Sequence, residues 1–381
     1  MRYAITHRLL IAIVLAAMAG VANNVVAARH LPTYDIVDLG TLSSQVASFA
    51  FGISNSGYIA GRTEDDAVGW RKGIIIKLAE PTGTSAPEAL GVNDRGIFVG
   101  DFFDFPTATS LPFVIDETGL HMLPTLPGPG EGMATSINDM GEIGGVSLVG
   151  STDPLDRMGG QRAVVWIDGH IRDLGTLGGP SAISDTAVLN NRGDVAGASQ
   201  FDMTVNPLIR SYGYHATLWR GTSGERILVE DLGALSTEPD NSLSLAKNVN
   251  EAGEVVGWSL TDVADTCFSG PQEWGFVWRQ NHMEGLAPLP GDCDAEANMI
   301  NNRGEIVGDS TGVSATGRAR TRAVLWIDGQ PLDLLTLVPA ASGWRRLVFA
   351  TGINDRGEIV GTGVNQQGIP RAFLLRPHQG N

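Results

Sequence analysis

The nonapeptide Ile353–Gly361, INDRGEIVG, decides the fold because nearly the same nine residues occur seven times along the chain. The shared pattern is a hydrophobe, Asn, a polar residue, any residue, Gly, usually an acidic residue, two mostly apolar residues and a second Gly. The other copies are Ile53–Gly61, Val92–Gly100, Ile137–Gly145, Leu189–Gly197, Val249–Gly257 and Ile300–Gly308. Successive copies begin 39, 45, 52, 60, 51 and 53 residues apart. A period near 50 that absorbs insertions indicates an array of similar supersecondary units whose insertions fall in loops.

Each copy is followed by a stretch of β-branched and aromatic residues, which is typical of a strand. These stretches are Ala67–Arg71, Pro112–Asp116, Arg162–Asp168, His215–Arg220, Gly275–Arg279, Arg322–Asp328 and Arg371–Arg376. Two of them end in Asp-Gly, at Asp168 and Asp328, a dipeptide favoured in tight hairpins. A further stretch follows, as in Ile171–Leu177, Ile227–Leu235 and Pro331–Leu337. Each unit therefore predicts four short strands.

The Asn-containing core of each copy is interpreted as the turn between the first and second strands. Asn can hydrogen-bond its own backbone nearby, and Gly adopts the left-handed conformation that closes a hairpin. Seven copies of one hairpin need only this structural cause. We therefore do not assign these Asn, Asp and Glu side chains a calcium-binding or catalytic role.

The two ends of the array predict how it closes. Tyr34–Leu42 matches a fourth strand but has no first three strands before it, whereas the last unit has its first three strands and no fourth. The first segment is thus expected to complete the last unit and to leave no open edge. We predict an all-β, seven-bladed β-propeller of four-stranded blades, with residues 29–381 as a single domain. An open solenoid would instead need distinct capping repeats, and a large two-sheet β-sandwich is the remaining alternative.

Residues 1–28 precede the array and have the pattern of a secretory signal peptide. Arg2 and Arg8 provide a basic start, Leu9–Ala19 is an apolar run too short to span a bilayer, and Val25–Ala28 offers small residues for cleavage. An uncleaved anchor is the alternative. We expect an exported protein, periplasmic or extracellular, with no membrane span after cleavage.

The charge of the chain restricts its partners. The formal net charge is −16, and it becomes −18 without Arg2 and Arg8 because the leader holds no acidic residue. Nucleic acid is excluded as a partner, since its phosphates need Lys and Arg. The acidic balance also disfavours anionic lipid surfaces.

Cys267 and Cys293 are the only two cysteines. An even number in an oxidising compartment predicts a disulfide. In a four-stranded blade, the connection between strands two and three and the connection to the next blade lie on the same face, and in this chain these connections are the long ones. Both cysteines fall in such connections, so we expect them to meet. The disulfide would close a loop of about 25 intervening residues and stabilise the fold by roughly 3 kcal/mol. Two separate buried cysteines are the alternative.

The repeat motif, together with RAxxW and LGTL segments, resembles the HAF repeats of bacterial extracellular proteins, over roughly residues 34 to 376. The name-giving tripeptide is present in part, as His215-Ala216-Thr217 and Arg371-Ala372-Phe373. The resemblance implies a secreted or periplasmic protein and carries over no catalytic residue.

Ligand-binding candidates are sought on the face with the long, dissimilar connections, since function concentrates on loops held by a rigid scaffold. Tyr212, Tyr214 and Trp274 can stack on sugar rings, or can pack against the scaffold. Arg318, Arg320 and Arg322 alternate and can clamp an anionic ligand such as an acidic glycan, or can protect a strand edge. We expect a ligand on this face or at the channel mouth.

A metal site is considered near the two cysteines because several carboxylates gather there. The candidate ligands are Asp262, Asp265, Asp292, Asp294 and Glu296, with Glu273 beside them. Calcium takes six to eight oxygens, but no EF-hand loop is present. Solvated surface acids are the alternative, and no other cofactor is expected.

Catalytic motifs are absent from the sequence. The histidines form no zinc pair, no nucleophile elbow or phosphate loop occurs, and Ser244–Lys247 matches the Ser-x-x-Lys pattern without its companion motifs. We predict an exported, monomeric, non-enzymatic scaffold that binds an unknown extracellular ligand or protein. The alternatives are a glycan hydrolase or lyase that uses loop carboxylates, and a structural envelope protein.

Overall fold

The computed structural model describes residues 31–42, 46–81, 84–104, 107–150, 160–202 and 212–378, without side-chain detail at 84–86, 182–187, 202, 212 and 240. The expected signal peptide, residues 1–28, lies outside the described residues. Tyr34–Asn381 forms one compact unit. Nowhere in the described ranges is there a helix with the length and apolarity needed to cross a membrane.

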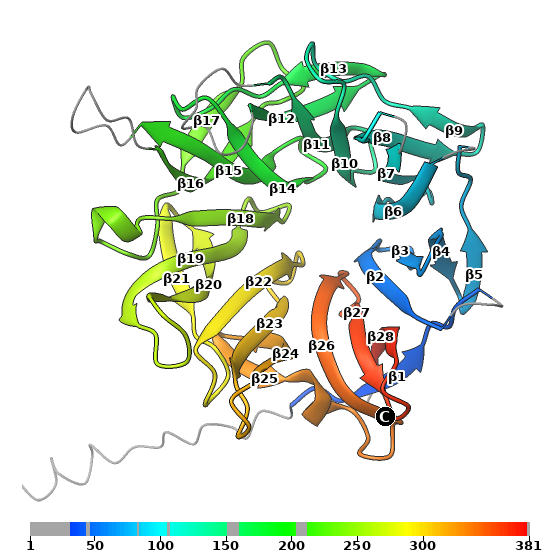
Figure 1. Cartoon of the computed structure of the whole chain (residues 1–381), viewed down its shortest axis with the longest axis vertical. Coiled ribbons are helices and arrows are strands. Elements are labelled where there is room, and N and C mark those ends of the chain that lie inside the picture. The colour runs from blue at the N-terminus through cyan, green and yellow to red at the C-terminus, as the bar shows by residue number, and fades with distance from the viewer. Residues whose placement is uncertain are drawn as a thin grey trace, which may run out of the picture. The chain divides into compact units, whose positions relative to one another are not determined.

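The unit is a ring of seven sheets, each with four antiparallel strands (Figure 1). Blade 1 contains β2 (Ser48–Ile53), β3 (Tyr58–Thr63), β4 (Ala67–Arg71) and β5 (Ile74–Lys77). Blade 2 contains β6 (Thr84–Val92), β7 (Phe98–Asp104), β8 (Thr109–Asp116) and β9 (Gly119–Met122). Blade 3 contains β10 (Gly132–Ile137), β11 (Ile143–Leu148), β12 (Gln161–Ile167) and β13 (His170–Asp173).

The ring continues in the same order along the chain. Blade 4 contains β14 (Ala182–Leu189), β15 (Val195–Asp202), β16 (Tyr212–Arg220) and β17 (Leu228–Asp231). Blade 5 contains β18 (Ser244–Val249), β19 (Val255–Ala264), β20 (Pro271–Arg279) and β21 (His282–Leu286). Blade 6 contains β22 (Asp294–Ile300), β23 (Ile306–Val313), β24 (Ala319–Ile327) and β25 (Gln330–Asp333). Blade 7 contains β26 (Trp344–Ile353), β27 (Ile359–Asn365) and β28 (Pro370–Pro377), and the first strand of the chain completes it.

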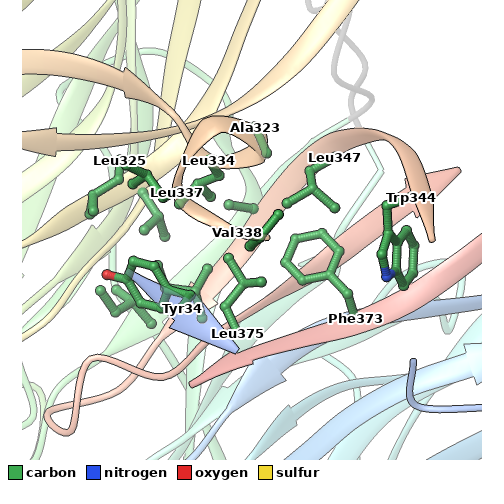
Figure 2. Packing of buried hydrophobic residues seen from close by; sticks show 14 residues of the cluster. Tyr34, Ala323, Leu325, Leu334, Leu337, Val338, Trp344, Leu347, Phe373 and Leu375 are labelled. Atoms are coloured by element: carbon green, nitrogen blue, oxygen red, sulfur yellow. The ribbon is translucent and has the colours of Figure 1, made fainter. Parts of the chain in front are cut away.

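That completing strand, β1 (Tyr34–Asp38), pairs antiparallel with β28 from Tyr34 opposite Pro377 to Asp38 opposite Phe373. Tyr34 is buried in a hydrophobic cluster that includes Leu337 and Phe373 (Figure 2). Burial raises the pKa of the Tyr34 hydroxyl to about 12 because the phenolate would lose its hydration. The predicted closure of the ring by the N-terminal strand is confirmed.

A β-bulge recurs in the first strand of the blades, next to a buried alanine. In β22 it lies between Ala297 and Met299, and in β18 between Ala246 and Asn248. The bulge brings strand one close to the second Gly of the repeat motif. A Cβ added to Gly308 would lie 1.9 Å from the carbonyl oxygen of Glu296, so this position accepts only glycine.

The Asn residues of the repeat motif close the predicted turns and also join neighbouring blades. The Asn301 side-chain oxygen accepts hydrogen bonds from the backbone N–H groups of Arg303 and Glu305, both at 3.0 Å. Its Nδ2 donates to the backbone oxygen of Asn354 in the next blade, at 3.0 Å. Equivalent bonds run from Asn93 to Asn138, Asn138 to Asn190, Asn190 to Asn250, Asn250 to Asn301 and Asn354 to Ser54. Blade 1 has Ser54 at this position instead of Asn. The structural interpretation of the motif is supported, and the interblade bonds explain why the amide recurs.

The expected fourth strands are too long, since β1 ends at Asp38, β13 at Asp173 and β17 at Asp231, and the largest difference is in blade 6. Of Pro331–Leu337, only the first residues belong to β25, because Leu334–Leu337 forms a 3-10 helix. Asp333 caps this helix by accepting a hydrogen bond from the backbone N–H of Leu335 at 3.0 Å. The helix buries Leu334 and Leu337 against blade 7, which an extended segment would not do.

Candidate functional site

A cavity of about 790 Å³ occupies the centre of the ring. Its walls are the first strands of the blades, and the Asn-containing turns surround one end. Figure 1 shows these first strands, from β2 to β26, facing the middle of the ring. The bulged residues Leu90, Thr135, Lys247, Asn298 and Thr351 all line the cavity. In each of these blades, the bulged residue is therefore one of those that line the channel.

The charged part of the wall lies between blades 5 and 6. The Lys247 ammonium forms an ion pair with Glu296 and donates to Asn298 Oδ1 at 2.9 Å. Asn298 Nδ2 in turn donates to Asp309 Oδ1 at 2.9 Å. All four side chains line the cavity. They form a connected polar group, which we call the channel cluster.

Glu296 and Asp309 are a directly opposed cross-strand pair on β22 and β23. Burial and the nearby Glu296 carboxylate raise the pKa of Asp309 to about 7. Burial, Glu296 and Asp294 likewise raise the pKa of Glu273, next to the cluster, to about 8. Carboxyl groups that hold a proton near neutral pH are enriched at functional sites, although structural networks shift pKa values too.

Glu296 directly precedes the buried alanine of strand one, and Asp309 directly follows the second Gly of the motif. The residue types at these two positions differ from blade to blade. Blade 5 has Leu245 opposite Trp258, and blade 7 has Phe349 opposite Thr362. Blade 2 repeats the carboxyl pair, with Glu88 opposite Asp101, and the pKa of Asp101 is also raised to about 7, by burial and Glu88. The motif residues are the same in most blades because they build the ring. The cross-strand pairs next to them differ between blades and so can determine which ligand the channel binds.

An aromatic pair lies beside the channel cluster. Tyr214 and Trp258 meet edge to face, with ring centroids 6.2 Å apart, and both line the cavity together with Leu245. Lys247 is two residues from Leu245 on the same strand. The cavity wall at blades 4 to 6 thus combines aromatic surface with a few convergent polar groups, the usual composition of a small-molecule site.

The three predicted aromatic ligand-binding residues do not form one site. Tyr214 lines the cavity, whereas the Trp274 ring packs on Gly285, and its Nε1 donates to Gln272 Oε1 at 2.9 Å. Tyr212 belongs to β16, and its side chain lies outside what the structure describes. Trp258, which the sequence analysis missed, takes the place expected for Trp274.

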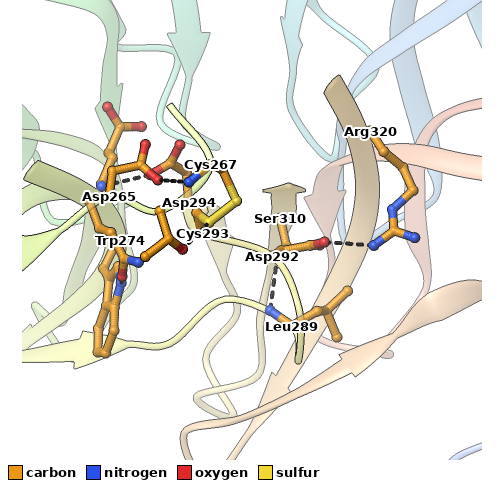
Figure 3. The surroundings of a disulfide bond; sticks show 12 residues. Asp265, Cys267, Trp274, Leu289, Asp292, Cys293, Asp294, Ser310 and Arg320 are labelled. Carbon is orange, nitrogen blue, oxygen red and sulfur yellow. Dashed lines mark hydrogen bonds and ion pairs between the residues drawn. A yellow bond between two sulfur atoms is a disulfide. The ribbon is translucent and has the colours of Figure 1, made fainter. Parts of the chain in front are cut away.

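Asp292 holds two of the three predicted arginines, and Figure 3 shows one of them, Arg320. Its fully buried carboxylate forms ion pairs with Arg320 at 2.9 Å and Arg322 at 2.8 Å. It also accepts a hydrogen bond from Ser310 Oγ at 2.9 Å. Arg318 is exposed and precedes β24. Arg320 and Arg322 therefore neutralise an internal carboxylate, and an anion clamp on this strand stays a prediction.

The five predicted metal-binding carboxylates have separate contacts. Asp262 accepts from Ser236 Oγ and the Thr237 backbone, and these hydrogen bonds lower its pKa to about 2. Asp294 Oδ1 accepts from the Glu273 backbone N–H at 2.9 Å. Asp265 Oδ1 accepts from the Cys267 backbone N–H at 2.7 Å. Asp292 is ion-paired with arginine, and Glu296 with Lys247.

Among the described residues, the potential metal ligands that lie close enough to share an ion are Asp265, Cys267 and Cys293. The two cysteines form the predicted disulfide, which joins the β19–β20 loop to the segment before β22 (Figure 3). Their sulfurs are consumed by that bond, so the group offers one carboxylate as a ligand. A calcium site near the disulfide remains a prediction.

Lys247, Asn298, Asp309 and Trp258 are the candidate site residues that the sequence analysis did not select. A signal for the carboxyl pair is present, since only the copies at Val92 and Ile300 combine Glu-Ala upstream with Asp after the second Gly. The sequence contains no comparable signal for Lys247 and Asn298, because it is the β-bulge that turns their side chains toward the channel.

The seven four-stranded blades define this chain as a β-propeller. No family model matches the sequence, so the resemblance to HAF repeats stays a prediction, and no curated protein matches it either. Among solved structures it is similar to the β-propeller domain of the Trilobed protease from Pyrococcus furiosus, with 10% identity and a TM-score of 0.51, over 90% of this chain and 95% of that one. That domain is described as having an open velcro topology, whereas here β1 pairs with β28. A protein of unknown function from Dyadobacter fermentans matches at 9% identity and a TM-score of 0.43, over 91% of this chain and 100% of that one.

Proposed function

We propose that this protein is a binding propeller whose ligand enters the central channel and is held at blades 4 to 6. The observation that carries the proposal is the composition of the cavity wall. The channel cluster and the Tyr214–Trp258 pair occupy adjacent parts of it, and both depend on residues that the repeat itself does not require. A polar group beside an aromatic surface suits a compact ligand with hydroxyl or amino groups, such as the end of a glycan.

The proposal includes export to the periplasm or beyond the cell. It is supported by the signal-like residues 1–28, by the Cys267–Cys293 disulfide, which persists in oxidising compartments, and by the resemblance of the repeats to HAF repeats. The ligand is then an extracellular or cell-wall component, and the propeller acts as a monomer.

A second candidate function is glycan cleavage, and the raised pKa values of Asp309 and Glu273 are the observation that favours it. A carboxyl group that keeps its proton near neutral pH can act as a general acid beside an ionised partner. The acids would belong to the channel rather than to the loop, because Asp292 is fully buried against arginine. Release of sugar from a polysaccharide panel, abolished by Asp309→Asn, tests this candidate, and intact substrate after prolonged incubation contradicts it.

We expect a ligand of the channel to raise the melting temperature of the protein, and we expect this rise to require Trp258. At about 100 times its dissociation constant, a ligand stabilises by about 2.7 kcal/mol, which corresponds to a rise of roughly 3–4 °C for a domain of this size. The measurement screens glycans, cell-wall fragments and small amines against the mature protein and against Trp258→Ala.

Trp274→Ala is the matched control, because this half-buried tryptophan of the same blade packs outside the cavity. Each variant is compared with its own unliganded melting temperature. A shift that is lost in Trp258→Ala and kept in Trp274→Ala supports the proposal. A flat response across the panel, or a shift that Trp258→Ala retains, contradicts it.

A further inference from the structure

We infer that the channel ligand is an organic cation, whose ammonium group binds at Asp309 while its carbon skeleton lies against Tyr214 and Trp258. The inference rests on the proposed function, since it names the ligand class of the same cavity. It follows from the charge of the cavity wall, from the hydrogen bonding of one buried carboxylate and from the neighbouring aromatic pair.

The charge of the wall favours a cation. Among the described residues that line the cavity there is one basic side chain, Lys247, and it is already paired with Glu296. The lining carboxylates are Asp94, Asp139, Glu251, Glu296, Asp309 and Asp355. Four of them belong to the Asn-containing turns that surround one end of the channel. A narrow passage lined by one sign of charge concentrates ligands of the opposite sign.

Asp309 is the carboxylate placed to receive that cation. It is 8% exposed, lines the cavity and accepts a hydrogen bond on Oδ1 from Asn298. Within the described part of the chain, its Oδ2 makes no hydrogen bond or ion pair and is reached by solvent. A buried carboxylate is costly unless it is paired. A ligand ammonium at Oδ2 would supply the missing partner.

Lys247 shows that this wall already accommodates an ammonium group. Its Nζ is held by Glu296 and Asn298, one position along the cluster from Asp309. Because Glu296 is satisfied by Lys247, a second cation adds charge compensation at Asp309 rather than competing for Glu296. The arrangement then alternates positive and negative groups along the wall.

The Tyr214–Trp258 pair lines the same cavity as Asp309 and offers an aromatic surface for the rest of the ligand. Trp258 is opposite Leu245 on β18, two residues from Lys247, and Tyr214 packs edge to face against it. Aromatic faces attract ammonium groups and their attached methylenes, and tryptophan is the strongest of them. A neutral ligand would use the aromatic surface but would leave Asp309 unpaired.

Blade 2 contains an internal control for this inference. Its Glu88–Asp101 pair occupies the equivalent positions, but there Glu88 binds Arg62 of blade 1 at 3.1 Å. Neither Glu88 nor Asp101 is among the cavity-lining residues. The two blades thus share the carboxyl pair and differ in whether it faces the cavity.

The test is isothermal titration of the mature protein with two pairs of probes that differ in charge. Choline is compared with its neutral isostere 3,3-dimethyl-1-butanol, and n-butylamine with 1-butanol, at about pH 8, where Asp309 is ionised and both ammonium groups keep their charge. We expect the cationic member of at least one pair to bind about tenfold or more tightly than its neutral partner. Asp309→Asn should lose about tenfold in affinity, and Asp101→Asn should stay within about twofold of the wild type.

The outcomes separate the inference from the proposed function. Equal binding of charged and neutral partners overturns the cation inference while the channel remains a binding site. A cation that binds Asp309→Asn as tightly as the wild type overturns the assignment to Asp309. Binding of none of the four probes overturns the inference as well, and the thermal-shift panel then decides independently whether the channel binds anything.

Discussion

Replacing Asp292 by alanine is expected to destabilise the protein by roughly 3 kcal/mol, because it leaves two arginines without their counter-ion. The Asp292 side chain is fully buried, whereas those of Arg320 and Arg322 are 38% and 21% exposed. Water reaches the guanidinium groups in part, which places the effect at the lower end of the range for broken buried pairs. Denaturant unfolding followed by tryptophan fluorescence measures the change.

Two further variants separate charge from packing at this position. Asp292→Asn keeps the shape and one acceptor for Ser310 but removes the charge, so we expect an intermediate loss of stability. Asp65→Ala removes an exposed carboxylate of blade 1 and should change the free energy of unfolding by less than about 0.5 kcal/mol. Unfolding midpoints of Asp292→Ala that match the wild type would show that the arginines are satisfied by solvent.

Asp309→Asn is expected to stabilise the protein at high pH and to leave its stability nearly unchanged at low pH. The folded-state pKa of Asp309 is about 7, against 3.8 for an exposed aspartate. Between these values the folded protein holds a proton that the unfolded chain releases, so stability falls as the pH rises from about 4 to about 7. Asparagine does not ionise and avoids this loss, which is on the order of 4 kcal/mol.

The measurement is the free energy of unfolding of wild type and variant at about pH 5 and about pH 8. Asp101→Asn should behave in the same direction, because burial raises the pKa of Asp101 to about 7 too. The two variants therefore agree in stability but differ in ligand binding, since only Asp309 lines the cavity. Identical pH dependence of the wild type and Asp309→Asn would contradict the raised pKa.

The stabilisation expected for Asp309→Asn agrees with a general property of binding sites. Binding sites retain groups that weaken the unliganded fold, and their removal raises stability at the expense of function. Asp309 is such a group, because its Oδ2 has no protein partner among the described residues. The Glu88–Asp101 pair of blade 2 shows that a buried carboxyl pair alone does not make a binding site, because this pair does not line the cavity.

The fold could be predicted from the sequence because its determinants are local and repeated. Each Asn and first Gly of the motif fixes one hairpin, as the positive φ of 75° at Gly357 illustrates. The unmatched segment at Tyr34 then required a partner at the other end of the chain. The disulfide followed from topology as well, since Cys267 and Cys293 fall on one face of a propeller.

The site could not be predicted, because its residues meet through register and through the ring. Lys247 faces the channel only because the bulge after Ala246 turns it there, and it meets Glu296 of the following blade. The sequence suggests Asp292 as a metal ligand or a solvated acid, whereas β24 brings Arg320 and Arg322 to it. Such pairings depend on the relative position of adjacent blades, and a single sequence contains no measure of that position.

The most direct test of the account is a crystal structure of the mature protein grown with the tightest-binding cation from the titrations. We predict ligand density in the channel between blades 4 and 6, with the cationic group in contact with the Asp309 carboxylate and the skeleton against Tyr214 and Trp258. Density on the long connections near Cys267 instead, or an empty channel at saturating ligand, would contradict the assignment of the channel as the binding site.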